Sequence, residues 1–259
     1  MNILDKIIET KKIEVANSKS RVSINDLRDS EFFNQPTHSL KLSLKSQSGI
    51  IAEFKRKSPS KGNINNSVNS NEVVENYVNY GASGVSILTD ETYFGGSLQD
   101  ILNLTETCTI PILRKDFMID EYQFYEAKSV GADVVLLIAS CLSPDQVEEF
   151  TELSHQLGLE VLLEIHSEEE LKHFNSKIDF VGINNRNLKN FEVDLQHSVD
   201  LKNLLPKNTL SIAESGIYSI ESYNFLKEKG FDGFLMGEYF MKNQNPGKAF
   251  SEFIKAIEL

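Results

Sequence analysis

The chain has 259 residues, of which 40% are hydrophobic and 25% charged, which is the composition of a globular protein and excludes collagen-like, coiled-coil and wholly disordered chains. Lys and Arg number 26 against 38 Asp and Glu, and the resulting charge of −12 argues against binding to nucleic acid or to an anionic membrane. No apolar run approaches the roughly 20 residues that cross a bilayer, and the start of the chain is too charged for a secretory signal. Cys108 and Cys141 have neither metal-type spacing nor the number expected of a disulfide framework, so we expect a protein of the reducing cytoplasm.

Residues 1–48 have the pattern of a helical extension rather than of strands. A second short helical segment covers 23–30 (SINDLRDS). We expect this extension to pack on one end of the domain that follows. The apolar stripe of its first helix consists of Ile3, Ile7, Ile8, Ile13 and Val15.

From residue 49 onward the sequence repeats one unit, a short apolar or β-branched run followed by a helical stretch and then Gly or Pro. Successive runs begin roughly 20–35 residues apart, the length of a strand with its crossover helix. The runs are GIIAEFK (49–55), GVSILTD (84–90), PILRKDF (111–117), ADVVLLIAS (132–140), LEVLLEIH (159–166), FVGINNR (180–186), TLSIAES (209–215) and GFLMGE (233–238).

Apolar strands that alternate with helices form a parallel sheet covered on both faces. About eight such units favour a closed (β/α)8 barrel, so we predict a single TIM-barrel domain, 1–259, with the extension at 1–48 and the barrel at 49–259. The main alternative, a Rossmann fold, requires a G-x-G-x-x-G turn after its first strand. That turn is missing, because RKSPSKG follows the first run.

Side chains alternate between the two faces of a strand, and one face of most runs changes from apolar to polar toward the carboxyl end. If that face points into the barrel, its polar groups meet at the end where barrel enzymes build their active sites. Any one of these charges could end a strand only because it reaches solvent, but a set in phase on several strands favours an active site. The set is Glu53, Lys55, Lys115, Glu164, Asn184, Arg186 and Glu214.

A phosphate site is predicted at the last two strand ends, IAESG and FLMGE. Barrels commonly hold phosphate there with backbone N–H groups, which Ser215, Gly216, Gly237 and Glu238 could supply, although both glycines could equally be turn residues. A phosphorylated substrate would make this pocket negative. A carboxyl kept protonated, or a lysine held beside a glutamate, could then act as an acid.

The segments IIAEFKRKSPSKG, PILRKDFMID, GADVVLLIAS, LEVLLEIHSEEEL, GINNRNL, IAESGI and FLMGEYFM together resemble indole-3-glycerol-phosphate synthases. The resemblance covers nearly the whole chain, including the extension. It implies a TIM-barrel carbon–carbon lyase of tryptophan biosynthesis. Such an enzyme closes the ring of 1-(2-carboxyphenylamino)-1-deoxyribulose 5-phosphate with loss of CO2 and water.

The same resemblance implies roles for individual residues. Lys115 is expected to be the general acid and Glu164 its proton-transfer partner, while Glu53 and Asn184 stabilise a cationic intermediate. Lys55 is expected near the anionic groups of the substrate. The residues expected to bind substrate are Ser58, Pro59, Phe94 and Phe117 around the aromatic ring, Arg186 at the anthranilate end, Glu214 and Ser215, with Gly216, Gly237 and Glu238 at the phosphate.

Nothing in this reaction requires a cofactor or a metal, and no His, Cys and Asp cluster has metal spacing. His166 follows Glu164 by two residues and is interpreted as a supporting or solvent-facing residue. Asn185 is expected to face outward. The partner is a small phosphorylated molecule, the chain a monomer or weak homo-oligomer, and the loop 56–71 a candidate mobile lid.

Three other functions remain open from the sequence. One is another phosphate-binding barrel enzyme such as phosphoribosylanthranilate isomerase, and a second is an aldolase with Lys115 as a Schiff-base nucleophile. The third is a barrel without catalytic activity that binds a partner, which would leave the charged strand ends without a purpose.

Overall fold

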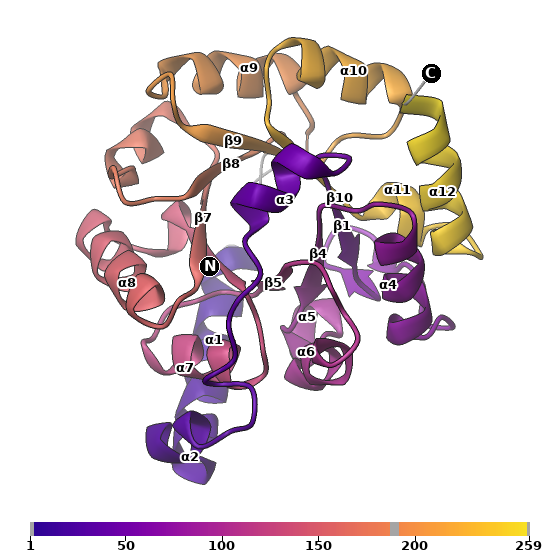
Figure 1. Ribbon diagram of the computed structural model, residues 1–259. Helices are drawn as coiled ribbons and strands as arrows, with labels where there is room; N and C mark the ends of the chain where they lie inside the picture. The colour runs from indigo at the N-terminus through magenta and orange to yellow at the C-terminus, as the bar shows by residue number, and fades with distance from the viewer. Residues whose placement is uncertain (1–2, 187–191, 258–259) are drawn as a thin grey trace.

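The structure is a computed structural model that describes residues 3–186 and 192–257. Its centre is a closed barrel of parallel strands in the order β1-β10-β9-β8-β7-β6-β5-β4 (Figure 1). The predicted (β/α)8 barrel is therefore confirmed. The strands are β1 (Ile50–Phe54), β4 (Gly84–Leu88), β5 (Ile112–Lys115), β6 (Val134–Ile138), β7 (Glu160–Ile165), β8 (Phe180–Asn184), β9 (Leu210–Glu214) and β10 (Gly233–Met236).

Helices surround the barrel, and one crossover is unusually short: β7 and β8 are joined through the 3-10 helix η2 (Glu168–His173). A second 3-10 helix, η1 (Ala139–Cys141), follows β6. The other barrel helices are α4 (Ser70–Asn79), α5 (Glu91–Phe94), α6 (Leu98–Thr105), α7 (Tyr122–Ser129), α8 (Pro144–Gln156), α9 (Leu195–Leu204), α10 (Ile220–Glu228), α11 (Glu238–Met241) and α12 (Pro246–Ile257).

The predicted alternation of side chains is confirmed by two separate hydrophobic clusters. The cluster inside the barrel includes Ile51, Leu113, Leu162 and Ile212, each two residues before a charged strand end. The outward-facing residues of the same strands, such as Ala52, pack against the helices. Polar residues that continue the inward face must therefore meet at the carboxyl ends of the strands.

The extension contacts both ends of the barrel, and not one end as predicted. Its helices are α1 (Ile3–Arg21), α2 (Ile24–Arg28) and α3 (Leu40–Ser46). Leu40 and Leu44 of α3 belong to the inner cluster and close the amino end of the barrel, whereas α1 lies behind the barrel in the view of Figure 1, at the carboxyl end.

The predicted stripe of α1 is wrong at one position. Ile13 is 64% exposed, whereas the buried residues of α1 are Ile7, Lys11 and Val15. These three are spaced by four residues and share one helix face. Lys11, the central member of the buried stripe, was missed because a lysine is almost never fully buried unless it is paired.

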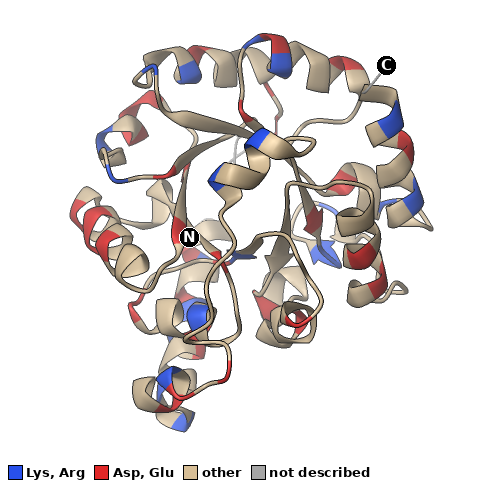
Figure 2. Cartoon of the chain, in the orientation of Figure 1, with Lys and Arg blue, Asp and Glu red and all other residues tan. Residues whose placement is uncertain are grey.

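The loop after β1 carries a small antiparallel hairpin of β2 (Lys57–Ser58) and β3 (Gly62–Asn63). Its base is fixed by Arg56, which makes a two-pronged ion pair with Asp100 at 2.6 and 2.8 Å. Acidic side chains are spread over the outer helices, with several on α8 (Figure 2). No helix among residues 3–186 and 192–257 has the length and apolarity needed to cross a membrane.

Candidate active site

A pocket of about 190 Å³ opens at the carboxyl end of the barrel, and every predicted site residue lines it. The strand-end positions explain this convergence, because inward-facing residues of neighbouring parallel strands meet at one rim. The predicted residues that line the pocket are Glu53, Lys55, Ser58, Pro59, Phe94, Lys115, Phe117, Glu164, Asn184, Arg186, Glu214, Ser215, Gly216, Gly237 and Glu238.

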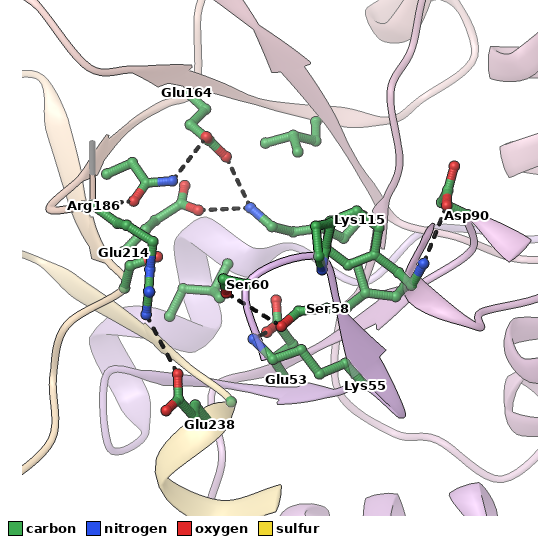
Figure 3. Close-up of a pocket in the computed structure, with 18 of the residues that line it drawn as sticks. Glu53, Lys55, Ser58, Ser60, Asp90, Lys115, Glu164, Arg186, Glu214 and Glu238 are labelled. Atoms are coloured by element: carbon green, nitrogen blue, oxygen red, sulfur yellow. Dashed lines mark hydrogen bonds and ion pairs between the residues drawn. The ribbon is translucent and has the colours of Figure 1, made fainter. Parts of the chain in front are cut away.

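Lys115 of β5 is held by two carboxylates, Glu164 of β7 and Glu214 of β9, whose strands lie on either side of β8 (Figure 3). Its Nζ donates to Glu164 Oε2 at 2.9 Å and to Glu214 Oε2 at 2.7 Å. The remaining oxygen of Glu164 accepts a hydrogen bond of 3.0 Å from Asn184 Nδ2. The ammonium group and the two carboxylates are nearly buried, so they interact at a low local dielectric.

The charges of this triad set the protonation states of its members. Burial alone would lower the pKa of Lys115, but the nearby carboxylates of Glu164, Glu214 and Glu53 outweigh burial and raise it. The lysine therefore stays an ammonium ion at neutral pH. Burial raises the pKa of Glu214 to about 7, even though Lys115 opposes the shift and Glu164 adds to it.

Glu164 shifts in the opposite direction. Burial would raise its pKa, but Lys115, His166 and the Asn184 hydrogen bond hold the pKa well below the usual range of a glutamate. Glu164 and Glu214, which contact the same lysine, therefore differ in protonation near pH 7. Such a divergence is what an acid–base pair requires.

Two glycines leave the room that these carboxylates occupy. A Cβ on Gly182 would overlap Glu214 Oε1, and a Cβ on Gly237 would lie 2.5 Å from Glu53 Oε1. Glu53 in turn accepts a hydrogen bond of 2.6 Å from Lys55 Nζ. Gly182 was predicted only as a strand residue, and its role depends on where the side chain of Glu214 lies on the next strand, which the sequence pattern does not show.

The turn after β9 has an unusual backbone. Ser215 has a φ of 62° and Gly216 a φ of 72°, a region that a non-glycine residue rarely adopts. Asn185 supports this turn, because its Nδ2 donates to the backbone oxygens of Glu214 and Ser215 at 2.9 and 2.7 Å. Asn185 does not line the pocket, but it is buried rather than exposed, and its role as a support was missed.

Glu238 lies at the mouth of the pocket between two cations. Its carboxylate is 3.3 Å from Arg186 Nη2 (Figure 3). It is also 3.4 Å from Nζ of Lys61, in the turn of the hairpin. Arg186 also donates to the hydroxyl of Tyr218. The guanidinium is therefore directed toward the end of the pocket where phosphate is expected, and not toward Phe94 and Phe117. The GINNRNL segment ends at 187–188, which lie outside the described residues.

The opposite wall of the pocket is apolar. Phe94 and Phe117 have ring centroids 6.1 Å apart, tilted by 42°, and Ile3, Leu4 and Ile7 of α1 complete this wall. The sequence analysis did not predict that α1 forms part of the pocket wall. The apolar stripe of α1 was predicted, but the sequence did not show which end of the barrel this stripe covers.

A buried ion cluster ties α1 to this wall. Lys11 Nζ lies 3.0 Å from Asp90, 2.9 Å from Asp116 and 2.6 Å from Glu14. Burial would lower the pKa of Lys11, but Asp116 and Asp90 raise it instead. Asp90 and Asp116 also line the pocket, and their positions just beyond two strand ends were the available signal.

Within residues 3–186 and 192–257, no three His, Cys, Asp or Glu side chains are grouped as the ligands of a metal ion would be. His166 is 12% exposed and lies beside Glu164 and Glu170. It is therefore a buried neighbour of the site and not a solvent-facing residue.

Comparisons with known proteins agree with the geometry. A relative from Bacteroides thetaiotaomicron, called indole-3-glycerol phosphate synthase, is 50% identical over 99% of both chains. Another of that name from Polynucleobacter asymbioticus is 42% identical, with 97% of this chain and 98% of the relative covered. A solved thiamine phosphate pyrophosphorylase from Pyrococcus furiosus shares the fold, with a TM-score of 0.60 and 17% sequence identity. The matched region covers 85% of this chain and 98% of the solved chain. The model of the indole-3-glycerol phosphate synthase family matches residues 4–253. The chain belongs to the indole-3-glycerol phosphate synthase family.

Proposed function

We propose that the chain closes the indole ring of 1-(2-carboxyphenylamino)-1-deoxyribulose 5-phosphate, with loss of CO2 and water, to give indole-3-glycerol phosphate. The observation that carries the proposal is the Lys115 ammonium, bonded to Glu164 and Glu214 at 2.9 and 2.7 Å inside the pocket. A charged donor beside an ionised acceptor supports a reaction that needs an acid and a base at neighbouring atoms.

In the first step the ring carbon that bears the carboxylate attacks the ketone carbon of the sugar. Lys115 gives a proton to the ketone oxygen, which becomes a hydroxyl group. The ring is then cationic, and the carboxylates of Glu53 and Glu164 stabilise that charge. Loss of CO2 leaves its bonding electrons in the ring and restores aromaticity, so this step needs no electron-accepting cofactor.

Dehydration follows in the second step. Glu164 removes a proton from the carbon between the nitrogen and the former ketone carbon, and the hydroxyl group leaves as water with a proton from Lys115. Glu164 can return its proton to Lys115 directly, since their atoms are 2.9 Å apart. Glu214, with a pKa raised to about 7 by burial, can supply the additional proton that the departing water requires.

The two ends of the pocket match the two ends of this substrate. Phe94 and Phe117 offer an apolar surface to the anthranilate ring. Gly216, Gly237 and the turn at Ser215 offer backbone N–H groups to the phosphate. The contacts of Arg186 favour the phosphate end for this residue, in place of the anthranilate end that the resemblance implied.

The raised pKa of Lys115 weighs against a Schiff-base aldolase, because a permanent ammonium ion is a poor nucleophile. Borohydride added with substrate should therefore trap no adduct on Lys115. A trapped adduct would favour the aldolase instead.

The test is formation of indole-3-glycerol phosphate from the synthetic substrate in the presence of a chelator. We expect turnover by the wild type and a fall in kcat of about 10²–10⁴-fold for Lys115→Ala, the usual contribution of a general acid. Lys57→Ala is the control, because this half-buried lysine donates to a backbone oxygen of Thr92 and does not line the pocket. The absence of turnover by folded wild-type protein would reject the proposal.

A further inference from the structure

The carboxylate of Glu164 has a second charged neighbour besides the catalytic lysine. His166 Nε2 lies 3.1 Å from Glu164 Oε1, the oxygen that does not face Lys115. The imidazole is 12% exposed and the carboxylate 5%. His166 does not line the pocket, so it can influence a bound substrate only through Glu164.

The surroundings of His166 favour its charged form on geometric grounds alone. The second ring nitrogen, Nδ1, lies 3.5 Å from Glu170 Oε2, and the backbone N–H of His166 donates to the same oxygen at 2.6 Å. A neutral imidazole has one N–H group and one lone pair. Its lone pair would have to face one of the two carboxylates, whereas an imidazolium places a positive charge beside both.

Other titratable groups around the ring do not reverse this conclusion. Cys141 of η1 is near both carboxylates, and burial, reinforced by Glu164, raises the pKa of its thiol to about 12, so it stays neutral. From α9, His197 Nε2 lies 2.9 Å from the backbone oxygen of His166 and not from its ring. Lys115 and, beyond it, Glu214 lie on the far side of Glu164. Burial lowers the pKa of His166, but the contacts with Glu164 and Glu170 raise it to about 10.

We propose that His166 is a positioning residue for proton transfer, whose imidazolium holds Glu164 ionised and fixes its orientation toward Lys115. The inference rests on the proposed function, in which Glu164 must be a carboxylate before it can accept a proton from the substrate carbon. No proton passes to His166 in this scheme. With Lys115 on one oxygen and His166 and Asn184 on the other, the carboxylate has a cation on each side.

The first test is the dependence of kcat on pH between about pH 3 and 9 for the wild type and His166→Gln, because the pKa of Glu164 lies well below the usual range of a glutamate. Loss of an opposite charge at this distance should raise the pKa of Glu164 by about one unit or more. The acid limb of the profile should therefore move to higher pH by a similar amount, while kcat near pH 8.5 and KM stay within a few-fold of the wild type. Glu170→Gln should move the limb in the same direction, because it removes one of the two groups that keep His166 charged.

The matched control is His155→Gln on α8, since His155 also pairs with a carboxylate, Asp179, at 2.9 Å but lies on the surface. Its profile should coincide with that of the wild type. If His166 only joins η2 to the barrel, His166→Gln will lower the thermal midpoint and leave the acid limb unmoved, and that result would overturn the inference.

The second test needs no turnover and so separates this inference from the proposed function. The ring nitrogens of His166 are observed by ¹⁵N NMR in the wild-type protein, and their signals are assigned by their loss in His166→Gln. We expect the imidazolium pattern to persist above pH 8. A neutral tautomer at pH 7 would overturn the inference, even if the wild type turns the substrate over.

Discussion

The buried lysine of α1 allows a quantitative test of how the extension is held to the barrel. Lys11 is 3% exposed, and its Nζ lies within 3.0 Å of both Asp90 and Asp116. Lys11→Met keeps an unbranched side chain of similar length and removes its charge. Asp116 retains Arg114 at 3.1 Å, but the other oxygen of Asp90 serves only to cap α5, so the Asp90 carboxylate is left buried without a cation.

Removal of one partner from a buried ion pair usually costs about 3–5 kcal/mol. The low end applies here, because Arg114 still neutralises part of the remaining charge. A loss of about 3 kcal/mol corresponds to a fall in thermal midpoint of about 6–12 °C for a chain of this size. Since α1 also forms one wall of the pocket, the KM for substrate should rise in the same variant.

The assay is thermal and urea unfolding of wild type, Lys11→Met and the neighbouring control Lys12→Met. Lys12 is paired with Glu9 at 2.7 Å, but its side chain is 60% exposed, so its substitution should cost less than about 1 kcal/mol. Asp90→Asn in the Lys11→Met background should restore part of the lost stability, because it removes the uncompensated charge. Equal unfolding midpoints for the Lys11→Met and Lys12→Met proteins would refute this account of the cluster.

Two further predictions concern Glu214. Gly182→Ala places a methyl group where Glu214 Oε1 lies. The methyl should displace that carboxylate and lower kcat by about 100-fold. An unchanged kcat in a folded variant would show that the site relaxes around the methyl group. The pKa of Glu214 is raised from 4.5 to about 7 chiefly by burial, so between these pH values the folded state holds a proton that the unfolded state has released. The free energy of unfolding should therefore fall as pH rises through this window. Glu214→Gln removes this effect. The difference in unfolding free energy between the wild type and Glu214→Gln should therefore change from pH 4.5 to 7 and then level off. A difference that is constant with pH would contradict the raised pKa.

Much of the site followed from the strand pattern alone. The inward face that carries Leu162 and Glu164 on one strand, and Ile212 and Glu214 on another, is a two-residue periodicity that is visible in the sequence. Because a closed parallel barrel brings all carboxyl ends to one rim, residues from five strands could be placed together before any distance was known. The phase of each strand was correct, since the apolar members of these faces form the inner cluster.

The supporting residues were not predictable in this way. Lys11 occupies an apolar position of its helix, so a pattern of hydrophobicity alone misplaces the stripe onto Ile13. Asn185 donates to the backbone at the end of β9. His166 lies beside the carboxylate of Glu164. Gly182 matters because a side chain of the next strand fills the space above it.

The sequence by itself determined the barrel, the register of each inward face and the residue types at its rim, because these depend on periodicities of two and 3.6 residues along the chain. Only the tertiary structure decided which carboxylate Lys115 contacts, which of them stays ionised, and that α1 and α3 lie at opposite ends of the barrel. Those properties depend on distances and burial between residues far apart in the chain, and the energy of a charge changes steeply with both.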